Sequence, residues 1–125
     1  MIYDTDILIW VQRGNAKAAT LIEKDTDKYL SIQSYMELLQ GAKNKAHHQY
    51  TKDFIHEFEF HILPFTENIG HRALVYVEQY ALSASMRAGD AIIAATAVEN
   101  NMILVSSNGK HFKVIKELQL KVFKP

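Results

Sequence analysis

The hydrophobic residues of this chain occur as short apolar runs separated by longer stretches with a helical period. Apolar runs at residues 2–3, 29–32, 61–65, 102–105 and 120–123 predict strands, the last of them at a sheet edge. Between these runs, apolar residues three or four positions apart predict helices at 7–11, 17–24, 45–60 and 69–80, and a helix that follows Ser34. Because strands alternate with helices, we expect an α/β fold around a mainly parallel sheet.

The helix predicted at residues 89–98 is built from small side chains and is apolar almost all round. A helix without a polar face belongs inside a protein, so we expect it at the centre of the fold. Asp90 stands at its start, where the helix dipole favours a carboxylate. The six residues 83–88 must carry the chain to this start, so the helix before them is expected to lie askew. One or two further helical turns are expected at 110–117.

Composition narrows the classes of function. A chain of 125 residues is expected to form one domain, over residues 1–125. Cysteine is absent, which excludes thiol catalysis and thiolate metal sites and fits a cytoplasmic protein. The 14 basic and 14 acidic residues balance, which argues against sequence-blind binding of long polyanions but allows a local nucleic-acid site. No leader or long apolar run occurs, so no membrane contact is expected.

Three acidic residues far apart in the sequence are predicted to meet at one edge of the sheet. Asp4 ends the first strand, and Glu37 lies in the first turn of the helix after the second strand. The helix that begins near Asp90 must end where the fourth strand starts, so Asp90 lies at the same edge. Ligands of open α/β sheets bind at these carboxyl ends of the strands. The same edge receives further polar residues that follow the first and fourth strands, namely Asp6, Ser106 and Asn108.

Carboxylates that crowd together repel one another unless a cation lies between them. Oxygen ligands without cysteine or histidine suit Mg²⁺ or Mn²⁺. We therefore predict that Asp4, Glu37 and Asp90 are catalytic and hold the metal, with Asp6 as an additional candidate ligand. Ser106 and Asn108 are assigned supporting roles. A divalent ion in such a site promotes hydrolysis of phosphodiesters.

Each acid also has a purely structural interpretation. The Asp-Thr-Asp segment can turn the chain and cap the following helix. Ser34 and Glu37 have the spacing of a capping box, in which both side chains bind amides of the first turn. Asp90 can serve the dipole of its helix. These interpretations explain each residue separately, but not a shared position that has no basic partner.

Four segments together resemble PIN-domain proteins of the VapC toxin type, over essentially the whole chain. They are Asp-Thr-Asp at residues 4–6, Ser-Tyr-Met-Glu-Leu at 34–38, Gly-Asp-Ala-Ile-Ile-Ala-Ala-Thr-Ala at 89–97, and the segment 104–112. The resemblance implies a three-layer α/β/α fold with a central, mainly parallel twisted sheet of four or five strands. It also implies an acidic pocket that holds Mg²⁺ or Mn²⁺ and cleaves RNA, a cognate antitoxin and a homodimer. The residues that match the family's acids and hydroxyl are Asp4, Glu37, Asp90 and Ser106.

The chain departs from the family pattern at two points. Asp6 stands where asparagine is common, which adds a carboxylate. A fourth acid after the last core strand is missing, since Asn108 and His111 occupy the corresponding positions. The departure bears on metal affinity, which depends on whether Asn108 or Asp6 takes over the lost ligand.

Other residues near this edge have two interpretations each. Arg87, Lys110 and His111 can contact a phosphate of the substrate, or they can be exposed charges on a loop and a cap. Two apolar surfaces can contact a dimer partner or an antitoxin, unless both surfaces are buried within one chain. The first is an aromatic stripe of Tyr50, Phe54 and Phe58, and the second is the face of Met36 and Leu39.

Two other functions are considered. The missing fourth acid favours a degenerate PIN-like module that binds RNA or a protein partner without cleavage. The Asp-Thr-Asp segment also resembles haloacid-dehalogenase phosphatases, in which Asp4 would be the nucleophile. That alternative requires a lysine and then a pair of acids later in the chain, yet Glu117 is the one acid after Ser106.

Overall fold

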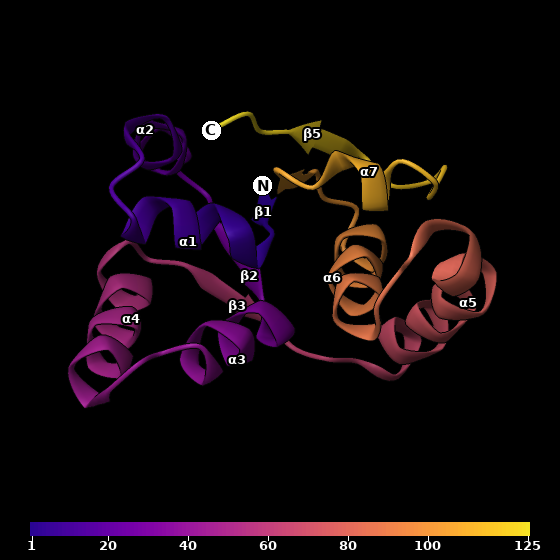
Figure 1. The fold of residues 1–125 in the computed structure, drawn as a ribbon, viewed down its shortest axis with the longest axis horizontal. Coiled ribbons are helices and arrows are strands. Elements are labelled where there is room, and N and C mark those ends of the chain that lie inside the picture. The colour runs from indigo at the N-terminus through magenta and orange to yellow at the C-terminus, as the bar shows by residue number, and fades with distance from the viewer.

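The five strands of the protein form one sheet in which every neighbouring pair is parallel. The computed structural model describes residues 1–125, and the strand order is β3-β2-β1-β4-β5 (Figure 1). The predicted parallel α/β sheet is therefore confirmed, with the C-terminal strand at an edge. The strands are β1 (Ile2–Tyr3), β2 (Tyr29–Ser31), β3 (His61–Leu63), β4 (Leu104–Ser106) and β5 (Leu120–Val122).

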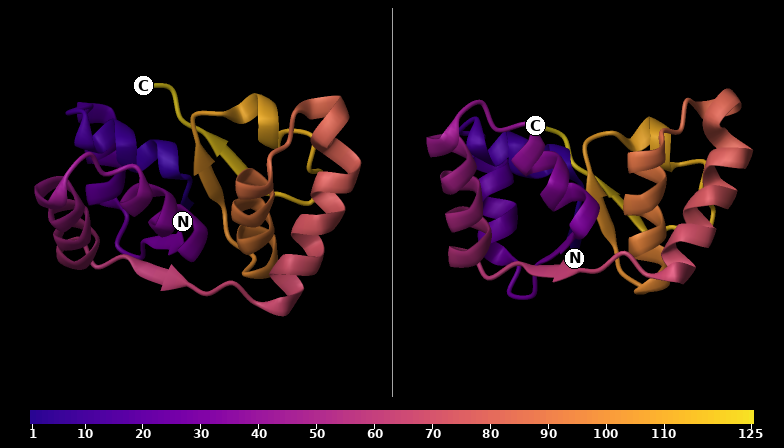
Figure 2. Two further views of the ribbon diagram at one scale, coloured as in Figure 1. Left: turned by 60° about the horizontal axis from the view of Figure 1, so that its bottom comes forward. Right: turned by 90° about the horizontal axis from the view of Figure 1, so that it is seen from below.

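Helices cover both faces of the sheet and complete three layers (Figures 1 and 2). On one face lie α1 (Thr5–Gln12), α2 (Ala16–Lys24), α3 (Ile32–Gln40) and α4 (Lys45–Glu57). On the other lie α5 (Glu67–Ala84), α6 (Ala88–Glu99) and α7 (Gly109–Phe112). Successive strand residues point to opposite faces, so Ile2 packs with the second group of helices and Tyr3 with the first. The expected α/β/α arrangement is confirmed.

Helix α6 lies at the centre of its layer, as its composition predicts. Ala91, Ala94, Ala95 and Ala97 have no exposed surface. These small side chains allow α5 and the sheet to approach the helix closely from both sides. The buried position fixes the start of α6, and with it Asp90, at the carboxyl ends of the strands.

Helices α5 and α6 are joined by residues 85–87. Ser85 adopts the left-handed conformation with φ 54°, which ends α5 and turns the chain back. Figure 2 shows α5 beside α6 and at an angle to it, as the short connection predicts.

Two predicted helices are shorter in the structure. Helix α4 ends at Glu57 instead of residue 60, because Glu59 adopts a left-handed backbone (φ 56°) and Phe60 turns into the core. The helical turns expected at 110–117 are reduced to α7. None of the helices is long and apolar enough to cross a bilayer.

Candidate active site

Asp4 connects β1 to α1 and is almost completely buried, with 6% of its surface exposed. It is the N-cap of α1, which begins two residues earlier than predicted, and its Oδ1 accepts a hydrogen bond from the Thr5 amide at 2.8 Å. Its Oδ2 accepts a hydrogen bond from Ser106 Oγ, 2.7 Å away at the end of the neighbouring strand β4. Asp4 therefore caps a helix and also lies at the carboxyl edge of the sheet.

Burial and nearby negative charge favour the protonated form of Asp4. Desolvation is the main cause and the charge of Asp6 is the next, and the pKa of Asp4 rises to about 7. Asp90 adds a smaller effect in the same direction, while the hydrogen bonds from Ser106 and Thr5 act against it. Asp4, Asp6 and Asp90 therefore lie close enough for their charges to repel.

Asp6, in the first turn of α1, points toward the segment that follows β4. Its Oδ2 accepts hydrogen bonds from the Ser107 amide at 3.0 Å and from the Ser107 hydroxyl. Its Oδ1 is buried and has no hydrogen-bond partner. Desolvation raises the pKa of Asp6, although both bonds from Ser107 oppose the rise. One carboxylate oxygen of Asp6 is thus buried without a hydrogen-bond donor.

Glu37 lies at the same edge and forms one hydrogen bond to α1 and one within its own helix, α3. Its Oε1 accepts a hydrogen bond from Thr5 Oγ1 at 2.5 Å, and its Oε2 accepts one from Gln33 Nε2 at 3.2 Å. Thr5 also binds Asp4 through its amide, so this threonine links the two acids. Oε2 further lies against Gly89, one residue before Asp90.

The predicted capping box of Ser34 and Glu37 is wrong. Helix α3 begins at Ile32, and Ser31 is its N-cap, with an Oγ that accepts from the Ser34 amide at 3.0 Å. The last residue of β2 therefore caps the helix, which starts three positions earlier than predicted. Glu37 lies in the second turn of α3 instead of the first. The backbone amides of the second turn are bonded within the helix, so Glu37 is available for another role.

Asp90 lies in the first turn of α6 and forms no capping hydrogen bond, since Arg87 occupies the N-cap position. Its Oδ2 is 3.6 Å from Nδ1 of His111, which is buried and has no hydrogen-bond partner. The expectation of acids without a basic partner is therefore incorrect at this point. His111 comes from α7, so a side chain that the sequence places near the missing fourth acid does reach the site.

The remaining predicted residues differ in burial, and Asn108 is intermediate. Ser106 is buried, donates to Asp4, and accepts a hydrogen bond from the Asn108 amide at 2.9 Å. Asn108 precedes α7 without a side-chain capping bond. Arg87 and Lys110 are exposed beside the starts of α6 and α7. We call Asp4, Asp6, Glu37 and Asp90 together the acidic site.

The donor set of the acidic site suits a hard divalent cation. It offers carboxylate oxygens from three helices, the Asp6 Oδ1 atom without a partner, and raised carboxylate pKa values that a cation would lower again. No three of these side chains converge as a preformed metal-binding group. The chemistry of these residues therefore fits Mg²⁺ or Mn²⁺. In this structure, hydrogen bonds from Thr5, Ser106 and Ser107 hold the side chains of Asp4, Asp6 and Glu37.

A pocket of about 250 Å³ continues from Glu37 between α1, α3 and the start of α4. A directional chain of hydrogen bonds forms one wall: the Lys43 amide donates to His47 Nδ1, and His47 Nε2 binds Gln12 Oε1 at 3.2 Å. Gln12 in turn donates to Thr51. No pattern in the sequence predicts this pocket, because its residues come from three helices and the segments beside them and share no motif.

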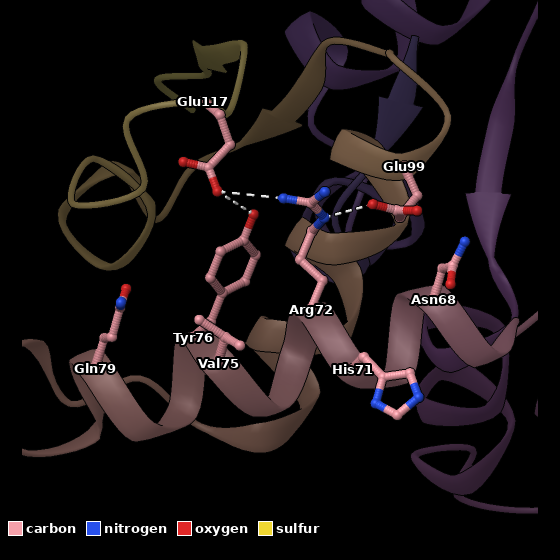
Figure 3. A pocket seen from close by; sticks show the side chains of 8 residues that line it. All are labelled: Asn68, His71, Arg72, Val75, Tyr76, Gln79, Glu99 and Glu117. Atoms are coloured by element: carbon pink, nitrogen blue, oxygen red, sulfur yellow. Dashed lines mark hydrogen bonds and ion pairs between the residues drawn. The ribbon is translucent and has the colours of Figure 1, made fainter.

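A larger cavity, of about 620 Å³, lies along α5 and away from the acidic site (Figure 3). Arg72 binds Glu99 and lies 3.5 Å from Glu117, which also accepts a hydrogen bond from Tyr76 at 2.7 Å. These groups satisfy one another and tie α5 to α6 and to the segment before β5. The main polar groups that line this cavity are therefore already partnered within the chain.

Comparisons with known proteins agree with this architecture. The sequence model of the PIN domain matches residues 1–118. A toxin-antitoxin complex from Klebsiella pneumoniae contains a chain that is 27% identical, with a TM-score of 0.79, over 94% of this chain and 93% of that one. VapBC2 from Rickettsia felis, bound to a DNA fragment from its promoter, gives 25% identity and a TM-score of 0.82 over 99% and 100% of the two chains.

VapBC-1 from nontypeable Haemophilus influenzae has the same fold, with 23% identity and a TM-score of 0.75 over 98% of each chain. A search of curated protein sequences gives no match. The PIN-domain match argues against the phosphatase alternative, which also requires a later pair of acids that the sequence does not contain.

Proposed function

Because the chain belongs to the PIN-domain family of nucleases, we propose that it is a Mg²⁺- or Mn²⁺-dependent endoribonuclease. The observation that carries this proposal is the connection of Asp4 and Glu37 through Thr5, at the carboxyl edge of the sheet and beside the start of α6. Helix capping does not explain why acids from three helices lie at this edge, since neither Glu37 nor Asp90 caps a helix.

The acids have distinct positions in this proposal. Asp4, Glu37 and Asp90 hold the metal, and Asp6 is an additional ligand through its unpartnered Oδ1. When bound, a divalent ion polarises a phosphoryl oxygen and lowers the pKa of water that it binds. The catalytic residues are thus Asp4, Glu37 and Asp90.

Neighbouring side chains orient these acids. The Ser106 hydroxyl and the Thr5 amide each bind one oxygen of Asp4, so the carboxylate cannot rotate freely. Asn108 supports Ser106 through its backbone amide. His111 faces Asp90 and, when protonated, offsets part of the negative charge that would repel a phosphate. Arg87 and Lys110, which are exposed at the same edge, supply charge for the substrate backbone.

We further propose that the protein is the toxin of a toxin-antitoxin pair, acts in the cytoplasm and forms a homodimer. The similar chains from Klebsiella pneumoniae and Rickettsia felis belong to complexes of this kind, which supports an antitoxin partner here. Met36 and Tyr50 are 50% and 52% exposed and offer apolar contact area on α3 and α4. Phe54 is buried in the core against Phe58 and does not contribute to that surface.

The activity is tested by incubating the purified protein with a pool of structured RNA and a matched DNA pool. We expect RNA cleavage with Mg²⁺ or Mn²⁺, no cleavage with a chelator, and none by Asp90→Asn protein with an unchanged circular dichroism spectrum. Expression of the wild type, but not of Asp90→Asn, should arrest growth of the host if the protein is a toxin. Cleavage by both proteins alike would refute the assigned site.

A second candidate function is a module that binds RNA or a protein partner without cleaving. The observation that favours it is His111, which lies beside Asp90 where a further acid would strengthen metal binding. Two results distinguish the candidates. A non-cleaving module binds RNA equally well with and without a divalent ion, and the RNA stays intact.

A further inference from the structure

We propose that the groove between α2 and the edge strand β5 binds a single-stranded segment of RNA that leads to the acidic site. This inference rests on the proposed function and extends it to the path of the substrate. The groove has a volume of about 550 Å³. Four lysines line it, Lys17 and Lys24 from α2 and Lys121 and Lys124 from β5 and the segment after it. We call this feature the lysine groove.

The charge of the lysine groove is uncompensated. None of its four lysines forms an ion pair with a carboxylate, and no acidic residue lines the groove. The chain as a whole is neutral, with 14 basic and 14 acidic residues, so this is a local concentration of positive charge. All four lysines are exposed and free to move toward a ligand. Such a groove attracts a polyanion, whose bound counterions are released by lysine contacts.

The floor of the groove is apolar. Leu21 of α2 and Phe123 after β5 line it together with the lysines, and both are half-buried. Cationic walls with an aromatic floor are the combination that binds single-stranded nucleic acid, because phosphates contact the lysines and bases pack on the ring. A duplex would expose its phosphates but not its base faces, so the floor favours a single strand.

The groove is linked to the acidic site through the sheet: Phe123 directly follows β5, and β5 pairs with β4, the strand that ends at Ser106. The Phe123 amide donates a hydrogen bond to the Ser106 carbonyl at 2.8 Å. The Ser106 hydroxyl binds Asp4, and the Ser107 amide binds Asp6. One backbone hydrogen bond therefore separates the groove floor from the residue that orients Asp4. Figure 1 shows the C-terminal segment passing from β5 toward α2. The groove floor therefore lies at the carboxyl edge of the sheet, one strand away from the end of β4.

The inference is tested by binding instead of cleavage. An unstructured, fluorescently labelled 12-nucleotide RNA is titrated with Asp90→Asn protein in the presence of Mg²⁺, and the dissociation constant is measured by anisotropy at several salt concentrations. The test variant carries Lys17→Glu and Lys121→Glu as well. The control carries Lys45→Glu and Lys52→Glu, which make the same change of charge on exposed positions of α4.

We expect the groove variant to bind the RNA at least tenfold more weakly than the control variant. We also expect its salt dependence to fall by about 1.4 in log–log slope, for two lost phosphate contacts on a single strand. Equal weakening in both variants, or no RNA binding by the Asp90→Asn protein, would overturn the inference. Stronger binding of an acidic peptide than of RNA would assign the groove to a protein partner instead. Thermal unfolding of each variant checks that it is folded.

The outcome separates this inference from the proposed activity. If the wild type cleaves RNA and the groove variant binds like the control, the nuclease stands and the lysine groove is not the substrate path. If the wild type does not cleave but the groove variant alone loses RNA binding, the groove binds RNA on a protein without nuclease activity.

Discussion

The point that a β-carbon on Gly89 would occupy lies 2.7 Å from Oε2 of Glu37. The same point is 3.3 Å from Nε2 of Gln33, which donates a hydrogen bond to that oxygen. Glu37 can therefore reach the start of α6 only because residue 89 has no side chain. The relationship connects an acid on one face of the sheet with the helix that carries Asp90 on the other.

Replacing Gly89 by alanine should displace the Glu37 carboxylate without unfolding the protein. The atoms that must move are the ends of two flexible side chains, and alanine is the better helix former by up to about 1 kcal/mol. We expect cleavage to fall at least tenfold while the unfolding temperature is unchanged or higher. In a Glu37→Ala background, the same change should cost nothing further. Additive losses in this double-mutant cycle would show that Gly89 acts independently of Glu37.

Substitution of Ser31 should lower the stability of the protein, whereas substitution of Glu37 should lower its activity. Ser31→Ala removes the N-cap of α3 and leaves the Ser34 amide unsatisfied in a buried site, which should cost about 1–2 kcal/mol of unfolding free energy. Glu37→Gln should leave the stability of the metal-free protein unchanged and slow cleavage strongly, to a residual rate that can still be measured. Urea denaturation and an RNA cleavage assay on both variants measure these effects. A large loss of stability in Glu37→Gln would contradict this prediction and indicate that Glu37 has a structural role.

Stability without metal should fall as pH rises, because of Asp4. In the unfolded chain an aspartate loses its proton near pH 4, whereas in the folded protein Asp4 retains it up to about pH 7. Between these values the unfolded chain binds fewer protons, so rising pH favours unfolding. Relative to Asp4→Asn, the wild type in chelator should lose about 3 kcal/mol between pH 5 and pH 8. Parallel pH profiles for the two proteins would contradict the raised pKa of Asp4.

His111→Asp should strengthen metal binding. Nδ1 of His111 is 3.6 Å from Asp90, so an aspartate at this position adds a carboxylate beside the acidic site. We expect Mn²⁺ to bind several times more tightly and the metal-free protein to be less stable, since another negative charge joins a repelling group. His48→Asp, at an exposed position of α4, is the control for the change in charge. Equal effects from the two substitutions would place His111 outside the metal site.

The parallel sheet could be predicted because its determinants are local. Short apolar runs separated by helical periods require crossovers, and the apolar helix at 89–98 has no exposed face to offer. From these features it followed that Asp4 and Asp90 lie at one edge. The start of α3 could not be placed in the same way, because Ser31 and Ser34 are both good caps and the choice depends on where β2 ends.

Contacts across the whole chain could not be predicted. Asp6 binds Ser107, and Lys17 lies across a groove from Lys121, in each case about a hundred residues apart. These contacts depend on the strand order, which places β4 beside β1 and β5 at the edge next to α2. His111 reaches Asp90 because the segment after β4 turns into the short helix α7 at once. The periodicity of apolar residues does not predict this turn between β4 and α7.

The most direct test of the account is a calorimetric titration of Mn²⁺ into the wild type and Asp90→Asn, with RNA cleavage measured on the same samples. We predict that the wild type binds the ion and cleaves RNA, and that Asp90→Asn loses both while its fold is unchanged. A folded wild type that binds no divalent ion, or that cleaves RNA equally well in a chelator, would contradict the assignment of a metal-dependent ribonuclease.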